Sequence, residues 1–340
     1  MIQKAMAQSK KRTSLKSLTN TQLRSSKQKH VRLAAIDIGS NAIRMVIADF
    51  SLQGMRLIQK YRFPIRLGAD VFVSGKISAK NLKLSARTFK QFKEVSENFQ
   101  VSQIRAVGTS ALREAKNQKA FVELIRRKSR IPIEIIDGVE EAQLIHEAVR
   151  HEVVLDTHQA LLIDIGGGSV ELSYSERGMM MATQSFPFGT VRTLELMKKK
   201  NLSESQLSLV IGDFLSPLTH FIQSHGRGHK VDFAIGTGGN LESLGKLKPI
   251  LLKSSSRTFL TFLELGEILQ KLEKMTIKDR IEKLKMRPDR ADVIVPAGLV
   301  IQTVMQQANI SKLLIPHVGL KDGLLWSLAQ RADYFSKSLG

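Results

Sequence analysis

The first half of the chain alternates apolar and polar residues in a pattern that predicts strands followed by helices. Residues 31–37 and 42–50 are nearly continuous apolar runs joined by a Gly-Ser-Asn turn, which is typical of a buried hairpin. The segment MRLIQKYRFPIRL predicts a third strand that ends near Pro64. Apolar residues then recur at helical spacing from Ser78 to Phe99, and further strands are predicted within QIRAVG and IPIEIIDG.

The second half repeats this order of elements. Three strands are predicted over residues 160–165, 169–175 and 179–186, and helical sequence follows from Val191. A strand, a glycine turn and a helix start are predicted in VDFAIGTGGNLESLG. The last strand is predicted in KLLIPHVG, and a closing helix in LKDGLLWSLAQRA. Each half therefore predicts an α/β domain with a mixed sheet flanked by helices, and we expect the ligand site in the cleft between them.

The tetrapeptide IDIG occurs twice, and each copy places a carboxylate, Asp37 or Asp164, inside an apolar strand. A buried carboxylate is costly unless it has a partner. If the two copies open equivalent hairpins, their turns face each other, and their backbone N–H groups form anion nests suited to phosphate. The expected phosphate-binding residues of these two turns are Gly39, Ser40, Asn41, Gly166, Gly167, Gly168 and Ser169.

A divalent metal is the expected partner of these acids. Asp37, Asp164 and Glu171 offer the oxygen ligands that Mg²⁺ prefers, and the chain has no cysteine, which excludes a thiolate site. The alternative is an ordinary glycine hairpin with an incidental acid, which a second copy disfavours. GTGGNL adds Gly238 and Gly239 as weaker phosphate donors at a helix start, without the lysine of a P-loop.

A general base is predicted in DGVEEAQLIHEAV. Glu141 shares a helical face with Ile145 and Val149, so its carboxylate leans into an apolar stripe that favours a perturbed pKa. The alternative is a solvated acid at a helix start. Arg44 and Arg113 each follow a predicted turn and are candidate phosphate ligands, with surface salt bridges as the alternative.

The charge balance points to an anionic partner. The chain carries 52 Lys and Arg against 31 Asp and Glu, a net charge of +21. Residues 1–30 hold eight of the cations and no acid, which is typical of a disordered, solvated tail; a polyanion-binding arm or a transit peptide is the alternative. No apolar run is long enough for a membrane span. We expect a cytoplasmic protein with neither membrane nor nucleic-acid partner and leave a homodimer open.

Seven segments together resemble the exopolyphosphatase and guanosine pentaphosphate phosphohydrolase (Ppx/GppA) family, in the superfamily of acetate kinase, sugar kinases, heat-shock chaperones and actin. They occur in the family's order and are AIDIGSNAIRMVIADF, VGTSALREAKN, IEIIDGVEEAQLI, LLIDIGGGSVEL, FPFGTVRTLE, AIGTGGNLESLG and RADVIVPAG. The resemblance implies two actin-like (ribonuclease H-like) domains, residues 31–139 with 319–340 and residues 140–318, after the tail.

The resemblance also implies an activity, Mg²⁺-dependent hydrolysis of the terminal phosphate of inorganic polyphosphate. Glu141, the second acid of EEA, would activate water, and Arg44 and Arg113 would bind phosphate. The alternatives are the same chemistry on guanosine pentaphosphate, and a non-catalytic protein that binds polyphosphate or a guanosine alarmone. Two departures bear on these: Ala42 replaces a Ser or Thr of the family, and Lys321 with Asp322 replaces Arg and Glu. Without a His-Asp dipeptide, the chain resembles the short, two-domain form.

Overall fold

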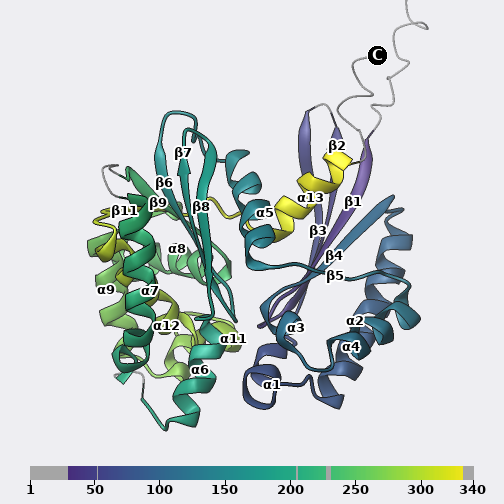
Figure 1. Cartoon of the computed structure of the whole chain (residues 1–340), viewed down its shortest axis with the longest axis horizontal. Coiled ribbons are helices and arrows are strands. Elements are labelled where there is room, and N and C mark those ends of the chain that lie inside the picture. The colour runs from purple at the N-terminus through teal and green to yellow at the C-terminus, as the bar shows by residue number, and fades with distance from the viewer. Residues whose placement is uncertain (1–29, 52, 204–205, 227–230, 332–340) are drawn as a thin grey trace, which may run out of the picture. The chain divides into compact units, whose positions relative to one another are not determined.

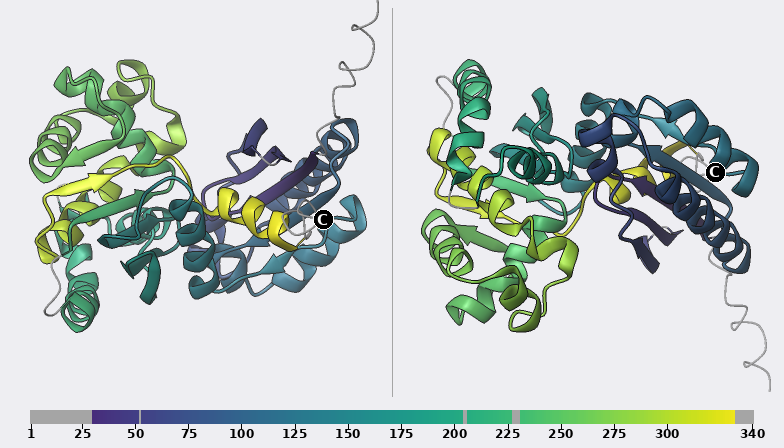
Figure 2. Two further views of the ribbon diagram at one scale, coloured as in Figure 1. Left: turned by 90° about the horizontal axis from the view of Figure 1, so that it is seen from above. Right: turned by 90° about the horizontal axis from the view of Figure 1, so that it is seen from below.

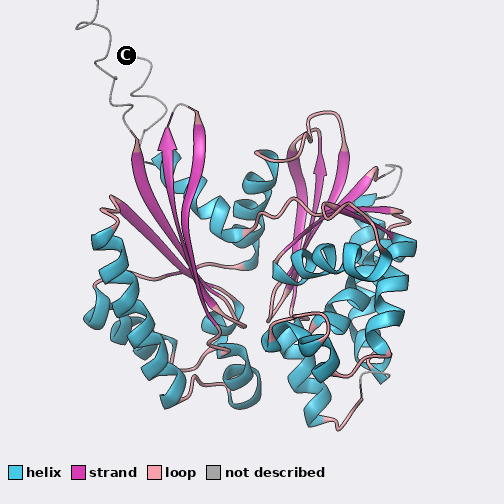
Figure 3. Cartoon of the chain, turned by 180° about the vertical axis from the view of Figure 1, so that it is seen from behind, coloured by secondary structure: helices cyan, strands magenta, loops and turns pink. Residues whose placement is uncertain are grey.

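The computed structural model describes residues 30–51, 53–203, 206–226 and 231–331, shown in Figure 1. The predicted basic tail, apart from His30, lies outside the described residues. The folded part contains two sheets, each with helices against it (Figure 3).

The first sheet has five strands in the order β3-β2-β1-β4-β5. Antiparallel hairpins join its first three strands, while β4 lies parallel to β1 and β5 parallel to β4. The sheet is therefore mixed, as predicted. Its strands are β1 (Val31–Ile38), β2 (Ile43–Ser51), β3 (Gly54–Phe63), β4 (Gln103–Gly108) and β5 (Glu134–Ile135).

Helices α2 and α4 pack against one face of this sheet. The Ser78 side chain caps α2 by accepting a hydrogen bond from the Asn81 backbone N–H. Phe89 and Phe92 of α2 and Phe121 of α4 form one apolar core with the strands. The helices of this region are α1 (Leu67–Ser74), α2 (Ala79–Asn98), α3 (Ser110–Glu114) and α4 (Gln118–Ser129).

The second sheet has six strands in the order β10-β11-β9-β6-β7-β8. Read from β8, and apart from the additional β10 at the far edge, this order repeats that of the first sheet. In both sheets the sequence across the sheet is the third, second, first and fourth strand of the unit and then its last strand. The repeat confirms the predicted fold class, two α/β units with mixed sheets flanked by helices. The strands are β6 (Gln159–Ile165), β7 (Val170–Glu176), β8 (Met179–Phe186), β9 (Phe233–Thr237), β10 (Phe259–Thr261) and β11 (Lys312–Leu314).

A second apolar core joins this sheet to its helices. Leu161, Ile163 and Ile165 of β6 pack with Leu244 of α8 and Ile301 of α12. The helices here are α6 (Thr190–Lys199), α7 (Ser208–Gly226), α8 (Gly239–Leu252), α9 (Phe262–Glu273), α10 (Ile277–Glu282), α11 (Pro288–Ala291) and α12 (Ile294–Gln307).

Helices α5 (Gly138–Arg150) and α13 (Leu320–Arg331) lie between the two sheets (Figures 1 and 2). Their buried residues share one apolar core with β1 and β2 of the first sheet and β6 and β9 of the second. The closing helix therefore returns to the first sheet, although it follows the last strand of the second sheet in the chain. This arrangement fixes the start of α5 beside β7 and β8.

The structure adds elements that the sequence pattern did not predict. Helix α1 and strand β10 lie in segments without a clear period, and the strand predicted in IPIEIIDG is reduced to Glu134–Ile135. Within the described ranges, no helix is both long enough and apolar enough to cross a lipid bilayer.

Candidate active site

A cavity of about 270 Å³ lies where the turns after β1 and β6 meet. Segments of both halves line it, because the two IDIG strands end at this point. Its walls include these residues predicted from the sequence: Asp37, Gly39, Ser40, Asn41, Arg44, Glu141, Asp164, Gly166, Gly167, Gly168, Ser169, Gly238 and Gly239.

The two glycine turns touch each other. A Cβ atom on Gly168 would lie 2.3 Å from Ser110 Oγ and 2.7 Å from Ser40 Oγ, so a larger residue cannot fit without displacing its neighbours. The Gly68 backbone N–H of α1 donates to the Ser40 carbonyl at 2.9 Å and holds the first turn in place. The expectation that the two turns face each other therefore agrees with their positions.

The two hairpins place different partners opposite their buried acids. Asp37 lies opposite Arg44 in the β1–β2 register, and Asp164 lies opposite Glu171 in the β6–β7 register. Arg44 Nη1 donates to Asp37 Oδ2 at 2.5 Å, so the first acid is paired within its own hairpin. The second acid instead accepts a hydrogen bond from the Thr237 hydroxyl of β9. The repeated motif therefore provides one ion pair and one pair of carboxylates.

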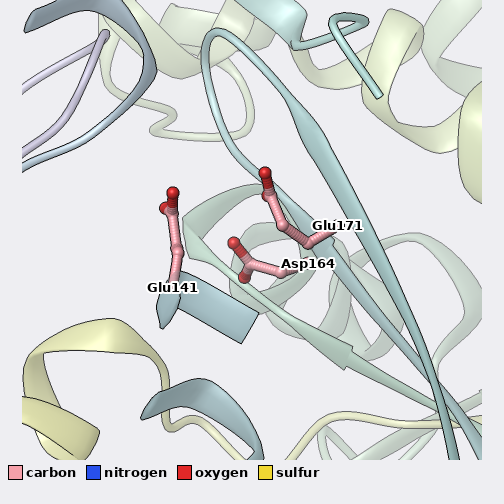
Figure 4. A group of neighbouring side chains, drawn as sticks. All are labelled: Glu141, Asp164 and Glu171. Carbon is pink, nitrogen blue, oxygen red and sulfur yellow. The ribbon is translucent and has the colours of Figure 1, made fainter. Parts of the chain in front are cut away.

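The carboxylates of Glu141, Asp164 and Glu171 lie close together, with Asp164 between the two glutamates in Figure 4. One carboxylate oxygen from each lies within 4.8 Å of the others. Glu171 Oε1 accepts a hydrogen bond from Ser185 Oγ at 2.8 Å, while Oε2 of both glutamates is buried without a partner among the described residues. Such a set of close, incompletely satisfied carboxylates is unstable as three negative charges and requires protons or a cation.

Burial and mutual repulsion raise the pKa values of this group. Burial, followed by the charges of Glu171, Asp164 and Asp37, raises the pKa of Glu141 well above 4.5. Burial and the charge of Asp164 raise the pKa of Glu171 to about 7, against hydrogen bonds from two serines. Burial also raises the pKa of Asp164. Glu141 thus has the raised pKa that its apolar helical face suggested.

The start of α5 explains the position of Glu141. Asp137 caps the helix by accepting from the Glu140 backbone N–H at 2.8 Å. This register turns Glu141 into the cavity and leaves Glu140 half exposed, where it binds Arg105 at 2.8 Å. The separation of the two neighbouring acids onto different faces follows from the 100° step of a helix.

Arg113 lies differently from the other predicted cations. Its Nη1 donates to the Ile136 carbonyl at 2.7 Å, just before the cap of α5, and the residue is not among those that line the cavity. Its charge nevertheless opposes the raised pKa values of Glu141 and Glu171. The hydrogen bond to Ile136 therefore indicates that Arg113 lies outside the cavity wall, on the far side of the carboxylates from the cavity.

A sequence model of the Ppx/GppA phosphatase family matches residues 46–332, which is most of the chain. The chain belongs to this family. As a Ppx/GppA phosphatase it is a phosphoanhydride hydrolase, as the resemblance implied.

Solved structures share the fold. A crystal structure of an exopolyphosphatase from Cytophaga hutchinsonii is 24% identical, covers 88% of this chain and 98% of that chain, and superposes with a TM-score of 0.80. The Ppx/GppA family member from Aquifex aeolicus is 22% identical, covers 90% and 99%, and has a TM-score of 0.72. A protein described as exopolyphosphatase-like is 25% identical, covers 89% and 99%, and has a TM-score of 0.76.

The two departures from the family pattern do not remove cationic or polar atoms from the cavity wall. Ala42 is fully buried and does not line the cavity; its carbonyl accepts from the Gly39 N–H at 3.2 Å. Lys321 lines the cavity and keeps a cation there, paired with Asp322 at 2.5 Å. The site of this Ppx/GppA phosphatase therefore retains its charge pattern at both positions.

The sequence reasoning missed several polar residues of the cavity. Arg290 belongs to the RADVIVPAG segment, yet nothing near it in sequence shows that it packs on the glycine turn: a Cβ atom on Gly239 would lie 2.4 Å from Arg290 Nη2. The further polar lining residues are Lys60, Tyr61, Arg62, Thr109, Ser110, Glu242, Arg287 and Arg290.

The carboxylate group fits a metal ion. Three oxygen donors within 4.8 Å, two of them on residues with an unpartnered buried oxygen, match the ligands of a hard divalent cation. Of the three predicted ligands, Asp164 and Glu171 belong to this group; Asp37 does not, because its carboxylate binds Arg44, and Glu141 is the third member.

Proposed function

We propose that this phosphatase removes the terminal phosphate of inorganic polyphosphate in a Mg²⁺-dependent hydrolysis. The observation that supports it best is the convergence of Glu141, Asp164 and Glu171 on a cavity walled by two glycine turns and several cations. A phosphoanhydride needs both a base for water and positive groups for the phosphate oxygens.

Glu141 is the proposed general base. Its raised pKa makes its carboxylate a stronger base toward a water proton, and its Oε2 has no other partner among the described residues. The water oxygen then bonds to the terminal phosphorus, and the bond from that phosphorus to the bridging oxygen breaks. The shortened chain leaves with the electron pair, and Glu141 later releases its proton to solvent or product.

The remaining residues bind and orient the substrate. The backbone N–H groups of Ser40, Asn41 and Gly167–Ser169 are proposed to surround the terminal phosphate, with Gly238 and Gly239 as further donors. Gly39 and Gly166 close the two turns, because their N–H groups donate to the Ala42 and Ser169 carbonyls. Asp164 and Glu171 would hold the Mg²⁺, with Asp37 beside them, and the ion would neutralise charge on the phosphate oxygens. Arg44 is proposed to bind a phosphate oxygen directly. Arg113 is proposed to stabilise the charged carboxylates of Glu141 and Glu171 from outside the cavity.

Charge favours polyphosphate over a nucleotide as the substrate. Residues 31–340 carry a net charge of +13, and Arg44, Arg62, Arg287, Arg290 and two lysines line the cavity. A long polyanion can use many such cations at once, whereas a nucleotide uses few. Guanosine pentaphosphate remains the alternative substrate of the same site.

The test is phosphate release from long-chain polyphosphate, guanosine pentaphosphate and ATP under identical Mg²⁺ concentrations. We expect the highest kcat/KM for polyphosphate and loss of activity with a chelator. A higher kcat/KM for guanosine pentaphosphate would assign the alternative substrate, and binding without release from any of the three would contradict the hydrolase proposal.

A further inference from the structure

Arginines gather on one part of the cavity wall beyond the residues of the proposed reaction. Arg62 and Arg290 line the cavity together with Arg287, and Lys60 lies on the same strand as Arg62. The positive charges of Arg287 and Arg44 act to lower the pKa of Arg62, and those of Arg44, Arg62 and Arg287 act to lower the pKa of Arg290. We call Arg62, Arg287 and Arg290 the arginine cluster.

The arginine cluster has too few counter-charges. Arg290 is only 4% exposed, and its Nη1 donates to the neutral Asn240 Oδ1 at 2.8 Å. The Nε atoms of Arg62 and Arg290 are buried without a hydrogen-bond partner among the described residues. Burial and the neighbouring cations lower the pKa of Arg290 to about 9. A buried guanidinium with a spare donor is costly, so the site favours an anion.

One carboxylate partly fills this need. Asp289 of α11 binds Arg62 of β3 with both carboxylate oxygens. Burial raises the pKa of Asp289, but its hydrogen bond to Arg62 and three arginine charges outweigh burial and hold that pKa below 3.8. Asp289 itself does not line the cavity, although its partner Arg62 does. The Asp289 carboxylate therefore binds Arg62 from behind the cavity wall, and not from within the cavity.

We infer that the arginine cluster is a second phosphate subsite, and that Asp289 is a built-in competitor that a phosphate group of the substrate displaces from Arg62. The subsite would take a phosphate of the chain other than the one being cleaved, which rests on the proposed function. Phosphate offers more acceptor oxygens and more charge than one carboxylate, so the exchange is favourable in a cavity that all three arginines line. No covalent bond changes in this exchange.

A neighbouring ion pair provides a matched control. Arg66 binds Asp292 through two contacts of 2.7 and 3.1 Å, and it links the same two regions of the chain as Arg62 and Asp289. The side chains of Asp289 and Asp292 are 16% and 20% exposed. Neither Arg66 nor Asp292 lines the cavity. Both Asp289→Asn and Asp292→Asn therefore remove an ion pair between these two regions. Only Asp289→Asn also frees an arginine that lines the cavity.

The experiment measures binding of tripolyphosphate and of orthophosphate by calorimetry, with EDTA present so that no metal contributes and no turnover occurs. Asp289→Asn should tighten tripolyphosphate binding about five- to tenfold, because the competing carboxylate is gone. Asp292→Asn should stay within twofold of wild type. Arg287→Gln, at an exposed position that leaves folding intact, should weaken binding by a similar factor.

The outcomes separate the possibilities. Equal or weaker tripolyphosphate binding by Asp289→Asn, in a variant whose thermal melting shows it folded, would overturn the inference, as would equal tightening in Asp292→Asn. If Asp289→Asn does not fold, unchanged binding by Arg287→Gln overturns it instead. Tightening for orthophosphate alone would assign the subsite to the released product rather than the chain and overturn the substrate role. Because binding is measured without turnover, absence of polyphosphate hydrolysis would reject the proposed function without changing this result.

Discussion

Two neighbouring acids on α5, Glu140 and Glu141, allow a sharp test of the proposed base. Glu141→Gln keeps shape and hydrogen bonding but cannot accept the proton, so kcat should fall about 10²- to 10⁴-fold while substrate binding is largely kept. The measurement is steady-state phosphate release together with equilibrium binding of polyphosphate.

Glu140→Gln is the control for this prediction. Glu140 has the same chemistry one residue away, but it faces Arg105 and not the cavity. Its replacement should leave kcat within about threefold of wild type. A Glu141→Gln enzyme with kcat within threefold of wild type would remove Glu141 from the role of base.

Glu171 predicts a pH dependence of stability in the metal-free protein. Its pKa is raised to about 7 in the fold from 4.5, so the folded state binds the proton more tightly than the unfolded chain does. The fold therefore loses stability as pH rises from about 4.5 to about 7, where the buried carboxylate ionises. Glu171→Gln should remove this loss and stabilise the protein at pH 8 by roughly 3 kcal/mol at most, with little effect near pH 4.5.

Urea unfolding at pH 5 and pH 8 in EDTA would measure it. If the free energy of unfolding changed equally between pH 5 and pH 8 in wild type and Glu171→Gln, the charge of Glu171 would not be the cause of the pH dependence. At pH 8, added Mg²⁺ should stabilise the wild-type protein more than Glu171→Gln, because the variant lacks one carboxylate ligand of the cation.

At the scale of residues, the sequence predicts side chains whose partners are near in the chain. The helical face of Glu141 and the repeated IDIG motif predict residues that line the cavity, among them Glu141, Asp37 and Asp164. Arg62 and Asp289 are 227 residues apart, and no local period links them. The pairing of Asp37 with Arg44 also depends on cross-strand register, which decides whether an acid meets a metal or a guanidinium.

At the scale of elements, Gly189 shows how α6 supports the glycine turn of the second hairpin. Gly189 precedes α6, and a Cβ atom there would lie 2.3 Å from the Gly168 backbone nitrogen and 2.4 Å from the Gly167 carbonyl carbon. Backbone cannot swing aside as a flexible side chain can. Gly189→Ala should therefore displace the turn, lower kcat/KM for polyphosphate at least tenfold and destabilise the fold by about 1–3 kcal/mol.

Gly212→Ala is the matched control, because a Cβ atom on Gly212 of α7 would meet no heavy atom within 4 Å among the described residues outside its own helix backbone and chain neighbours. In a helix this change should raise stability by up to about 1 kcal/mol and leave kcat/KM unchanged. Thermal melting and phosphate release of both variants provide the comparison. Wild-type kcat/KM in Gly189→Ala would show that the turn does not have to keep this position.

The elements themselves follow the sequence where a period is strong. The six predicted hairpin strands and the helix from Ser78 lie within a few residues of the observed ones, because alternation and helical spacing are both continuous there. Helix α1 covers only Leu67–Ser74, too short to display a period, and β10 is three residues that pair only with β11. Such short elements form from tertiary contacts, which a local pattern does not contain.

At the scale of the whole molecule, α5 and α13 connect the two sheets through a shared core. We propose that residues 31–139 with 319–340 form one domain and residues 140–318 the other, as the resemblance implied. By this division α5 belongs to the second domain, yet it packs against α13 of the first. Any change in the spacing of the two sheets would therefore move Glu141 relative to the turns. A rigid connection at α5 and α13 would keep the base in position.

Deletion of residues 1–30 tests whether the basic tail takes part in catalysis. The tail has eight cations, no acid and no candidate catalytic group, so we expect the shortened protein to fold and to keep its kcat. If the tail attracts polyphosphate, the deletion should raise KM for long chains at about 0.01 M salt, where the Debye length is about 30 Å, and have little effect near 0.15 M, where it is about 8 Å. Short chains cannot reach both the site and the tail, so their KM is the internal control. Equal KM values for both proteins across salt and chain length would exclude a catalytic role for the tail, and a collapse of kcat would show that the folded domain begins before residue 31.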